Sequence, residues 1–294
     1  MHAFATFIMR GPLQAGVVVF VASVLPLLAI VGAAALALVT LRDGARSAVL
    51  PAVGAGALLA VFHQVTLGSA EPTLRLVGEL WLPVLLLCEL LRRTTSLQLT
   101  VLVWTGLGAL TVAGFHMVVD NPVAFWQEVL APFVGPEAVE AAGEDPEFIR
   151  DVLLPVMTGY WALSLMFSVL LAMFLGRWMQ AILYNPGGFR SEFHALNLGR
   201  EAALVAAAVW AGALFTGPGL LYDLSLVVSA AFVLQALSMT HALVASRGWS
   251  PFWLVVVYLI TPFLFRPMAL VGVGDALFDW RRRWAGDSDD APPR

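Results

Sequence analysis

A few ionisable side chains inside long apolar segments are the groups in this sequence that could carry chemistry. His63 lies in AVFHQVTL, Glu79 in GELWLPVLLL and His241 in QALSMTH. Ionisable groups are costly at membrane depth and often mark ligand sites or proton paths. The simpler interpretation of the two histidines is a hydrogen bond to a neighbouring helix. Glu79 needs a proton, a partner or access to water.

A second set of polar residues lies near the ends of the apolar segments. His116 and Asp120 are four residues apart, so one continuous helix would place them on the same face. Such a pair could bind a metal ion, but it supplies fewer ligands than a protein site needs. We therefore predict an interfacial polar pair and no metal site. The candidate ligand-binding residues are Glu79, Trp81, His116, Asp120 and Trp161.

The loop GRWMQAILYNPGGFRSEFHALNLGR, residues 176–200, is unusually rich in polar groups. Asn185, Pro186 and the two glycines that follow predict a turn. Phe189, Phe193 and Leu196 have the spacing of a short amphipathic helix. Arginines beside such a turn could receive an anionic group, either a lipid phosphate or a partner's carboxylate. The residues of this candidate docking or anion-binding loop are Arg177, Trp178, Gln180, Tyr184, Asn185, Gly187, Gly188, Arg190, Glu192 and His194.

The composition indicates which elements must position these residues. Of the 294 residues, 60% are hydrophobic and only 12% are charged, whereas a soluble domain has about 25% charged residues. Apolar runs recur along the chain, and a helix of roughly 20 such residues crosses a bilayer core. The runs are apolar all round and lack the alternation of transmembrane strands. The sequence therefore predicts an all-α, polytopic transmembrane helical bundle.

About eight membrane spans are predicted. They are 14–40, 47–67, 73–91, 98–118, 152–176, 200–216, 220–245 and 251–271. The first is long for one crossing and has Pro26 near its middle, so it forms either one kinked helix or a hairpin of two short helices. It has no clear small-residue cleavage site, and we expect it to be retained and not cleaved as a signal peptide.

Arginines in short loops predict the orientation of the bundle, because such loops favour the cytoplasm. They occupy alternate loops, at Arg42 and Arg46, Arg92 and Arg93, Arg177, Arg190 and Arg200, and Arg247. The segment 119–151 then faces outward, and it carries eight carboxylates against one arginine. The two signals agree on one orientation.

The arginines near the two chain ends do not fit this orientation if each terminal span crosses the membrane once. Arg10 and the cluster Arg281–Arg283 also favour the cytoplasm, whereas single terminal spans would place both ends outside. We therefore expect both terminal spans to double back, the first at Pro26 and the last near Pro262, Arg266 and Pro267.

The outward segment 119–151 is expected to form an acidic cap over the bundle. Asp120, Asn121 and Pro122 predict the cap and first turn of a short amphipathic helix, AFWQEVL. Asp145 and Pro146 predict the start of another helix that continues into the fifth span, with a kink at Pro155. The chain as a whole is predicted to form one transmembrane helical domain over 1–285, which includes this cap and the cytoplasmic loop 177–200. A disordered tail is predicted over 286–294.

Small residues form two stripes at helical spacing. They are Ala33-x3-Ala37 in the first span and Ala52-x3-Gly56-x3-Ala60 in the second. Such stripes let helix backbones approach closely. Packing inside the bundle is the commoner explanation, and a docking face for a partner requires a stripe that points toward lipid.

Several chemistries need residues that this sequence lacks. All sixteen basic residues are arginine, which removes a Walker A motif and a Schiff-base lysine. The single cysteine, Cys88, permits no internal disulfide and no cysteine-based metal site. The sequence has no HExxH or G-x-S-x-G motif. We therefore expect no enzyme activity, no cofactor and no nucleic-acid partner.

The loop 176–200, with FIMRG near the start and GVGDALFDWRRR near the end, resembles the YybS-like family of uncharacterised bacterial membrane proteins. The likeness covers most of the chain, and NPGGF is its most specific part. The family is similar in fold to the S-components of energy-coupling-factor transporters and to the rod-shape protein MreD. The resemblance implies a helical bundle in the bacterial inner membrane, but no established activity. S-components have six helices, and their first helix docks on a coupling subunit through a small-residue face, to which Ala33-x3-Ala37 would correspond.

Two functions fit these observations. The first is binding of a small molecule or lipid in an S-component-like bundle, as in a transport subunit, with the site beneath the acidic cap. The second is a non-catalytic, MreD-like scaffold of the cell envelope, which docks a membrane-protein partner through the loop 177–200 and the C-terminal arginines. Membrane lipids are expected partners in both cases.

Overall fold

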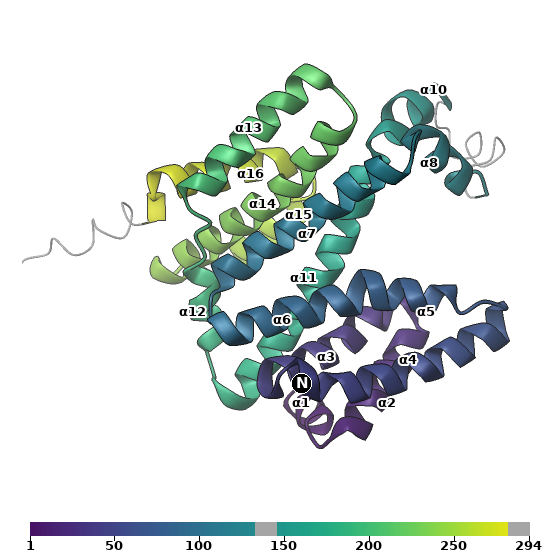
Figure 1. Ribbon diagram of the computed structural model, residues 1–294. Helices are drawn as coiled ribbons and strands as arrows, with labels where there is room; N and C mark the ends of the chain where they lie inside the picture. The colour runs from purple at the N-terminus through teal and green to yellow at the C-terminus, as the bar shows by residue number, and fades with distance from the viewer. Residues whose placement is uncertain (133–145, 282–294) are drawn as a thin grey trace, which may run out of the picture. The chain divides into compact units, whose positions relative to one another are not determined.

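The computed structural model describes residues 1–132 and 146–281, and all regular elements in these ranges are helical (Figure 1). This confirms the predicted all-α class. The chain divides into two compact units. Unit 1 comprises Met1–Trp104 and Leu165–Leu196, and unit 2 comprises Thr105–Ser164 and Asn197–Arg294. The single domain predicted over 1–285 remains a prediction from the sequence.

Five helical stretches in the described chain are individually long and apolar enough to cross a membrane. They are Pro26–Asp43 (η1 and α3), Ala45–Leu67 (α4), Leu97–Val118 (α7), Ile149–Tyr184 (η3, η4 and α11) and Leu220–Ser246 (α14). Two sharply bent helix pairs raise the number to seven if each pair is one span. By the length and composition of these helices, the chain has the architecture of a multi-pass membrane protein.

Two predicted spans are found neither among these five stretches nor in a bent pair, so the count of eight remains a prediction. The span at 73–91 is divided among α5 (Glu71–Leu76), the π-helical turn η2 (Val77–Trp81) and α6 (Leu82–Thr94). The span at 200–216 is α13 (Arg200–Thr216), whose 17 residues are near the short limit for a crossing.

The first predicted span is a hairpin of two helices in unit 1. Helix α1 (His2–Ile8) leads into α2 (Pro12–Val24) with a bend of 115°, and η1 (Pro26–Leu28) precedes α3 (Ala29–Asp43). Gly32 of α3 lies against α2, since a Cβ there would be 2.8 Å from Ser23 Oγ. The chain therefore reverses at Pro26, whose ring prevents a continuous helix. The hairpin alternative is confirmed.

The first small-residue stripe packs inside unit 1, and the second is half-buried. Ala33 and Ala37 are fully buried, and Gly176 of α11 (Met157–Tyr184) covers them, because a Cβ on Gly176 would lie 2.5 Å from Ala37 Cβ. Gly56 of the second stripe faces the ring of Trp81. The stripe at Ala33 therefore packs against another helix of the same chain. The family resemblance implied that this stripe docks on a coupling subunit, but in this structure its alanines are buried.

The long helix α14 is the centre of unit 2. Helix α15 (Phe252–Ile260) runs back along it, with Tyr258 next to His241, and α16 (Phe265–Phe278) follows after a bend of 118°. Arg266 near the start of α16 bonds to Ser225 of α14, and Asp275 near its end bonds to Gln235. Helix α16 therefore runs in the same direction as α14, and the last predicted span doubles back as expected.

The start of the outward segment agrees with the prediction. Asn121 Oδ1 accepts a hydrogen bond of 3.1 Å from the Ala124 amide and caps α8 (Pro122–Leu130). The chain resumes at α10 (Pro146–Phe148) and continues through the π turn η3 (Ile149–Leu153) and the 3-10 turn η4 (Leu154–Val156) into α11. The irregular turns surround Pro155, where a kink was predicted.

Part of the acidic cap and the C-terminal tail are outside the described residues. These are Glu137, Glu140, Glu144 and Asp145 of the cap, Arg282 and Arg283, and the predicted disordered tail 286–294. The acidic character of the cap therefore remains a prediction from the sequence, as does the side of the membrane that it faces.

Candidate functional site

A buried histidine–aspartate pair joins two helices of unit 2. His116 Nε2 lies 2.7 Å from Asp223 Oδ2, and the two residues are 107 positions apart in the sequence. Asp223 is in the first turn of α14 and is fully buried, whereas His116 is in the last turn of α7 and is half-buried. The pair fixes α7 against α14 and places a titratable group at the Leu220 end of α14.

Asp223 replaces the partner that the sequence predicts for His116. Asp120 was expected on the same helix face, but α7 ends at Val118 and Asp120 lies beyond it in an exposed position. The expectation of one shared helix face is therefore wrong. A residue in the following segment cannot keep the helical spacing once Asn121 begins a new helix.

The second oxygen of Asp223 lies at a close contact between helices. Oδ1 is buried and has no hydrogen-bond partner within the described residues. A Cβ on Gly159 of α11 would lie 2.7 Å from this oxygen, so only glycine fits there. The close approach of Gly159 therefore packs the backbone of α11 against this carboxylate at the start of α14.

Aromatic rings cover this end of unit 2. Phe115, next to His116, stacks on Trp126 with ring centroids 5.6 Å apart, and Trp161 lies 5.6 Å from Phe115. Trp126 Nε1 donates a hydrogen bond of 2.8 Å to Thr158 Oγ1. The predicted site residue Trp161 is therefore close to His116 through Phe115, and the aromatic cluster holds α7, α8 and α11 together.

A cavity of about 470 Å³ lies at the same end of α14. Its lining comprises Trp210, Ala213 and Leu214 of α13, Gly217 and Pro218 of the connection, Tyr222 of α14, and Arg266 and Leu270 of α16. This volume is within the range of roughly 300–1,000 Å³ found for ligand pockets. The lining is mainly apolar, and Arg266 is its one formally charged side chain.

Arg266 is held in this cavity by neutral groups. Its Nη1 donates a hydrogen bond of 3.0 Å to Ser225 Oγ, and its guanidinium carbon is 5.0 Å from the centre of the Tyr222 ring. Within the described residues Arg266 forms no ion pair. An arginine is always charged and has five N–H donors. The cavity therefore presents a positive group with donors available to a ligand.

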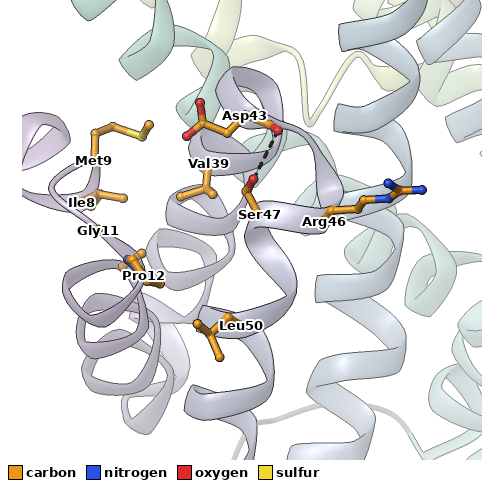
Figure 2. Close-up of a pocket in the computed structure, with 10 residues that line it drawn as sticks. Ile8, Met9, Gly11, Pro12, Val39, Asp43, Arg46, Ser47 and Leu50 are labelled. Carbon is orange, nitrogen blue, oxygen red and sulfur yellow. Dashed lines mark hydrogen bonds between the residues drawn. The ribbon is translucent and has the colours of Figure 1, made fainter.

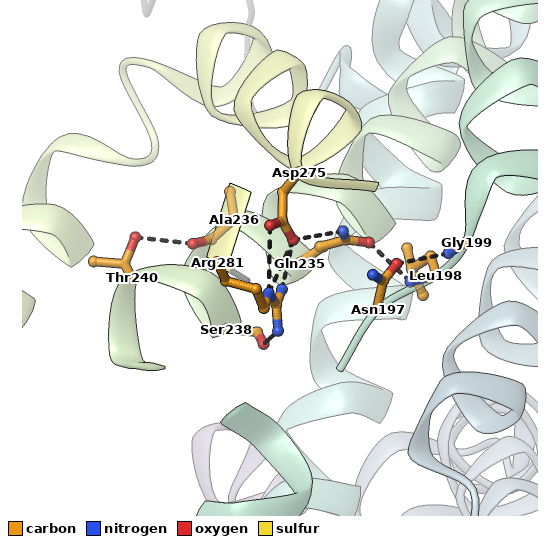
Figure 3. A network of polar contacts seen from close by, with 9 residues as sticks. All are labelled: Asn197, Leu198, Gly199, Gln235, Ala236, Ser238, Thr240, Asp275 and Arg281. Carbon is orange, nitrogen blue, oxygen red and sulfur yellow. Dashed lines mark hydrogen bonds and ion pairs between the residues drawn. The ribbon is translucent and has the colours of Figure 1, made fainter. Parts of the chain in front are cut away.

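A second polar network in unit 2 joins α14 to α16 (Figure 3). Asp275 Oδ2 accepts hydrogen bonds from Gln235 Nε2 at 2.8 Å and from Arg281 Nη2 at 2.6 Å, and Gln235 Oε1 accepts one from the Leu198 amide at 2.9 Å. Arg281 also contacts Ser238. Because its charges are paired and hydrogen-bonded, we assign this network to the packing of α14 with α16.

The other predicted site residues lie in unit 1. Glu79 is half-buried on the π turn η2, and Trp81 is almost fully buried at the end of that turn. His63 Nδ1 lies 2.8 Å from Thr73 Oγ1, which joins α4 to α5. His241 of unit 2 contacts Tyr258 in the same way. Both histidines therefore make the interhelical hydrogen bonds of the simpler interpretation, and Glu79 and Trp81 belong to a different unit from His116 and Trp161.

Unit 1 has a smaller cavity, of about 360 Å³, between the α1–α2 bend and the α3–α4 turn (Figure 2). Met9 and Gly11 line it together with Asp43, and Figure 2 shows Arg46 pointing away from Ile8. The neighbours of Arg10 thus lie at the same end of unit 1 as the α3–α4 turn, as the hairpin requires.

The predicted loop 177–200 is folded onto unit 1. Arg177 is buried, and its guanidinium is paired with Glu192 and bonded to Gln180 Oε1 at 2.8 Å. Phe189 and Phe193 of α12 (Gly188–His194) pack on Phe174, which confirms the amphipathic helix. The Arg177 guanidinium is therefore neutralised within the chain and offers no docking charge.

The remaining residues of this loop differ in exposure. Gly187 has the positive φ of 83° that the turn was predicted to need. The exposed residues are Trp178, Tyr184, Asn185, Gly187 and Arg190, and the half-buried ones are Gln180, Gly188, Glu192 and His194. Any docking through this loop would therefore depend on Arg190 and its neighbours.

Reversing the charge of Arg177 is expected to lower the free energy of unfolding by roughly 3 kcal/mol, because Arg177→Glu places a second carboxylate beside Glu192. Arg190→Glu, at an exposed position on α12, is the matched control and should change it by less than about 0.5 kcal/mol. Thermal unfolding of the two detergent-solubilised variants measures the change in stability of each. Equal stabilities of the two variants would contradict the buried pairing.

Two functional residues were missed at the sequence level. Asp223 occurs in GLLYDLSL inside an apolar span, and Arg266 was interpreted only as part of a turn. Both are ionisable groups within predicted spans, which was the signal used for Glu79 and His63. Applied evenly along the chain, that signal would have found them.

Comparisons with known proteins gave no match. No protein-family model, no curated protein and no solved structure matches this chain.

Proposed function

We propose that this protein is a multi-pass membrane protein that binds a small molecule or lipid in the cavity around Arg266. The arginine distribution predicts that this end of unit 2 faces outward. Binding at the outer end of a helical bundle is what a transport subunit of the S-component type requires, in keeping with the family resemblance of the sequence.

The observation that carries this proposal is the cavity itself. It combines a ligand-sized volume of about 470 Å³ with an apolar lining and one guanidinium that lacks an acidic partner among the described residues. Binding sites typically join an apolar wall to a few polar groups that fix orientation. In the Asp275–Arg281 network, by contrast, the charges are paired with each other.

The His116–Asp223 pair supports the proposal from the neighbouring turn of α14. Asp223 follows Tyr222, which lines the cavity, and it fixes α14 to α7. Together with the aromatic cluster around Phe115, it holds the helices that carry the cavity in one arrangement. A preformed site avoids the cost of ordering side chains on binding.

Filling the cavity is expected to remove the bound ligand. Leu270 lines the cavity and is exposed, so Leu270→Trp can fill it without disturbing the buried core. Native mass spectrometry of protein released from mild detergent should show a discrete adduct on the unaltered protein and about tenfold less on this variant. Leu204→Trp is the matched control, because Leu204 is an exposed leucine of α13 outside the cavity. Equal adducts on both variants, or none on the unaltered protein, would contradict the proposal.

A further inference from the structure

The charge in the cavity determines which ligands suit it. Arg266 uses Nη1 to bond to Ser225, and the Tyr222 ring faces its guanidinium. Neither neighbour is anionic, and the planar fork of an arginine matches the oxygens of a phosphate or carboxylate. A charged side chain in a mainly apolar cavity is stabilised when its counter-ion comes with the ligand.

The start of α14 lies next to the cavity in the sequence. The 27-residue helix begins at Leu220, beside Gly217 and Pro218 of the cavity lining. The amides at a helix N-terminus and the helix dipole both favour an anion there. The first turn of α14 already contains the carboxylate of Asp223, which is paired with His116, so Arg266 is the feature of the cavity that favours an anionic ligand.

The apolar surface beside the cavity indicates an amphiphilic ligand. Leu214 and Phe215 expose 86% and 91% of their surface, and Leu270 is also exposed. Leu214 and Leu270 line the cavity as well, so its apolar wall continues onto the surface that a membrane helix presents to lipid chains. A head group at Arg266 would leave its hydrocarbon chains along this surface.

We propose that the cavity binds an anionic membrane lipid, with the head-group phosphate on Arg266 and the acyl chains along Leu214 and Leu270. This inference rests on the proposed function, because it names the chemical class of the ligand for the same cavity. The inference requires that both the head group and the acyl chains of the lipid contribute to binding. The phosphate supplies the missing counter-ion, and the chains cover the exposed leucines.

The test is lipid retention by the full-length protein, measured by native mass spectrometry with added phosphatidylglycerol, diacylglycerol or inorganic phosphate. Phosphatidylglycerol should be retained about tenfold more than diacylglycerol. Arg266→Gln should abolish that preference, and Arg266→Lys should keep part of it because the charge remains. Arg247→Gln, at an exposed arginine beyond the other end of α14, is the matched control and should have no effect.

A further variant separates charge from folding. Ser225→Ala removes the hydrogen bond to Arg266 but keeps the guanidinium, and it should retain phosphatidylglycerol. If Arg266→Gln retains phosphatidylglycerol as the unaltered protein does, or if inorganic phosphate binds while the lipid does not, the lipid assignment is overturned. If Leu270→Trp lowers retention of both lipids equally and Arg266→Gln changes neither, the cavity still binds a ligand but the phosphate assignment falls. If Leu270→Trp changes nothing, the proposed function itself fails.

Discussion

Replacing Asp275 with alanine is expected to lower the free energy of unfolding by about 3–5 kcal/mol. Asp275 is fully buried and accepts hydrogen bonds from Gln235 and from two nitrogens of Arg281. The Arg281 side chain keeps only 14% of its exposure. Without Asp275 this guanidinium would lose the carboxylate with which it is paired, and the penalty of desolvating it would be offset less.

Two comparisons separate this charge effect from a loss of packing. The double variant Asp275→Leu with Arg281→Met removes both charges, and it should recover most of the lost stability, because apolar replacements of a buried pair are often neutral. Glu71→Ala breaks the exposed pair with Arg75 and should cost less than about 1 kcal/mol. Unfolding of the purified proteins in mixed micelles measures the free energy of unfolding of all three variants. A double variant as unstable as Asp275→Ala would show that volume, not the unpaired charge, determines the loss.

The helices of this protein could be predicted from the sequence because the apolar runs set their lengths directly. The hairpin at Pro26 and the reversal before Arg266 followed from proline chemistry and from the positions of terminal arginines. The start of α8 was predicted at Asp120, Asn121 and Pro122, and Asn121 forms the cap because its side chain has a local partner three residues ahead. Each of these features depends on residues that are close together in the chain.

The partners within the candidate site could not be predicted because they are distant in the chain. His116 pairs with Asp223 across 107 residues, and no local pattern distinguishes Asp223 from the nearer Asp120. The burial of Arg177 likewise depends on how α12 folds back against α11. Periodicity identified the residues on each helix face, but it could not show which faces of different helices pack against each other.

Introducing a methyl group at Gly272 is expected to force α14 and α16 apart. A Cβ at this position would overlap the carbonyl oxygen of Phe232, which is backbone and cannot rotate away. Overpacking of this kind costs roughly 1–3 kcal/mol, and Gly272→Ala should reach the upper part of that range. Thermal unfolding in detergent measures the loss. Gly114→Ala in α7 is the matched control, because nothing lies within 4 Å of its new Cβ, and alanine is the better helix former by about 1 kcal/mol.

The same substitution also tests how the cavity is built. Gly272 is on α16, the helix that carries Arg266 and Leu270, so the separation of α14 from α16 sets the distance of Arg266 from Ser225. Gly272→Ala should therefore lower phosphatidylglycerol retention several-fold at a temperature where the variant is still folded, whereas Gly114→Ala should not. If Gly272→Ala loses stability but retains the lipid fully, the cavity does not depend on the close approach of the two helices, and Arg266 must reach its ligand from a more adaptable position.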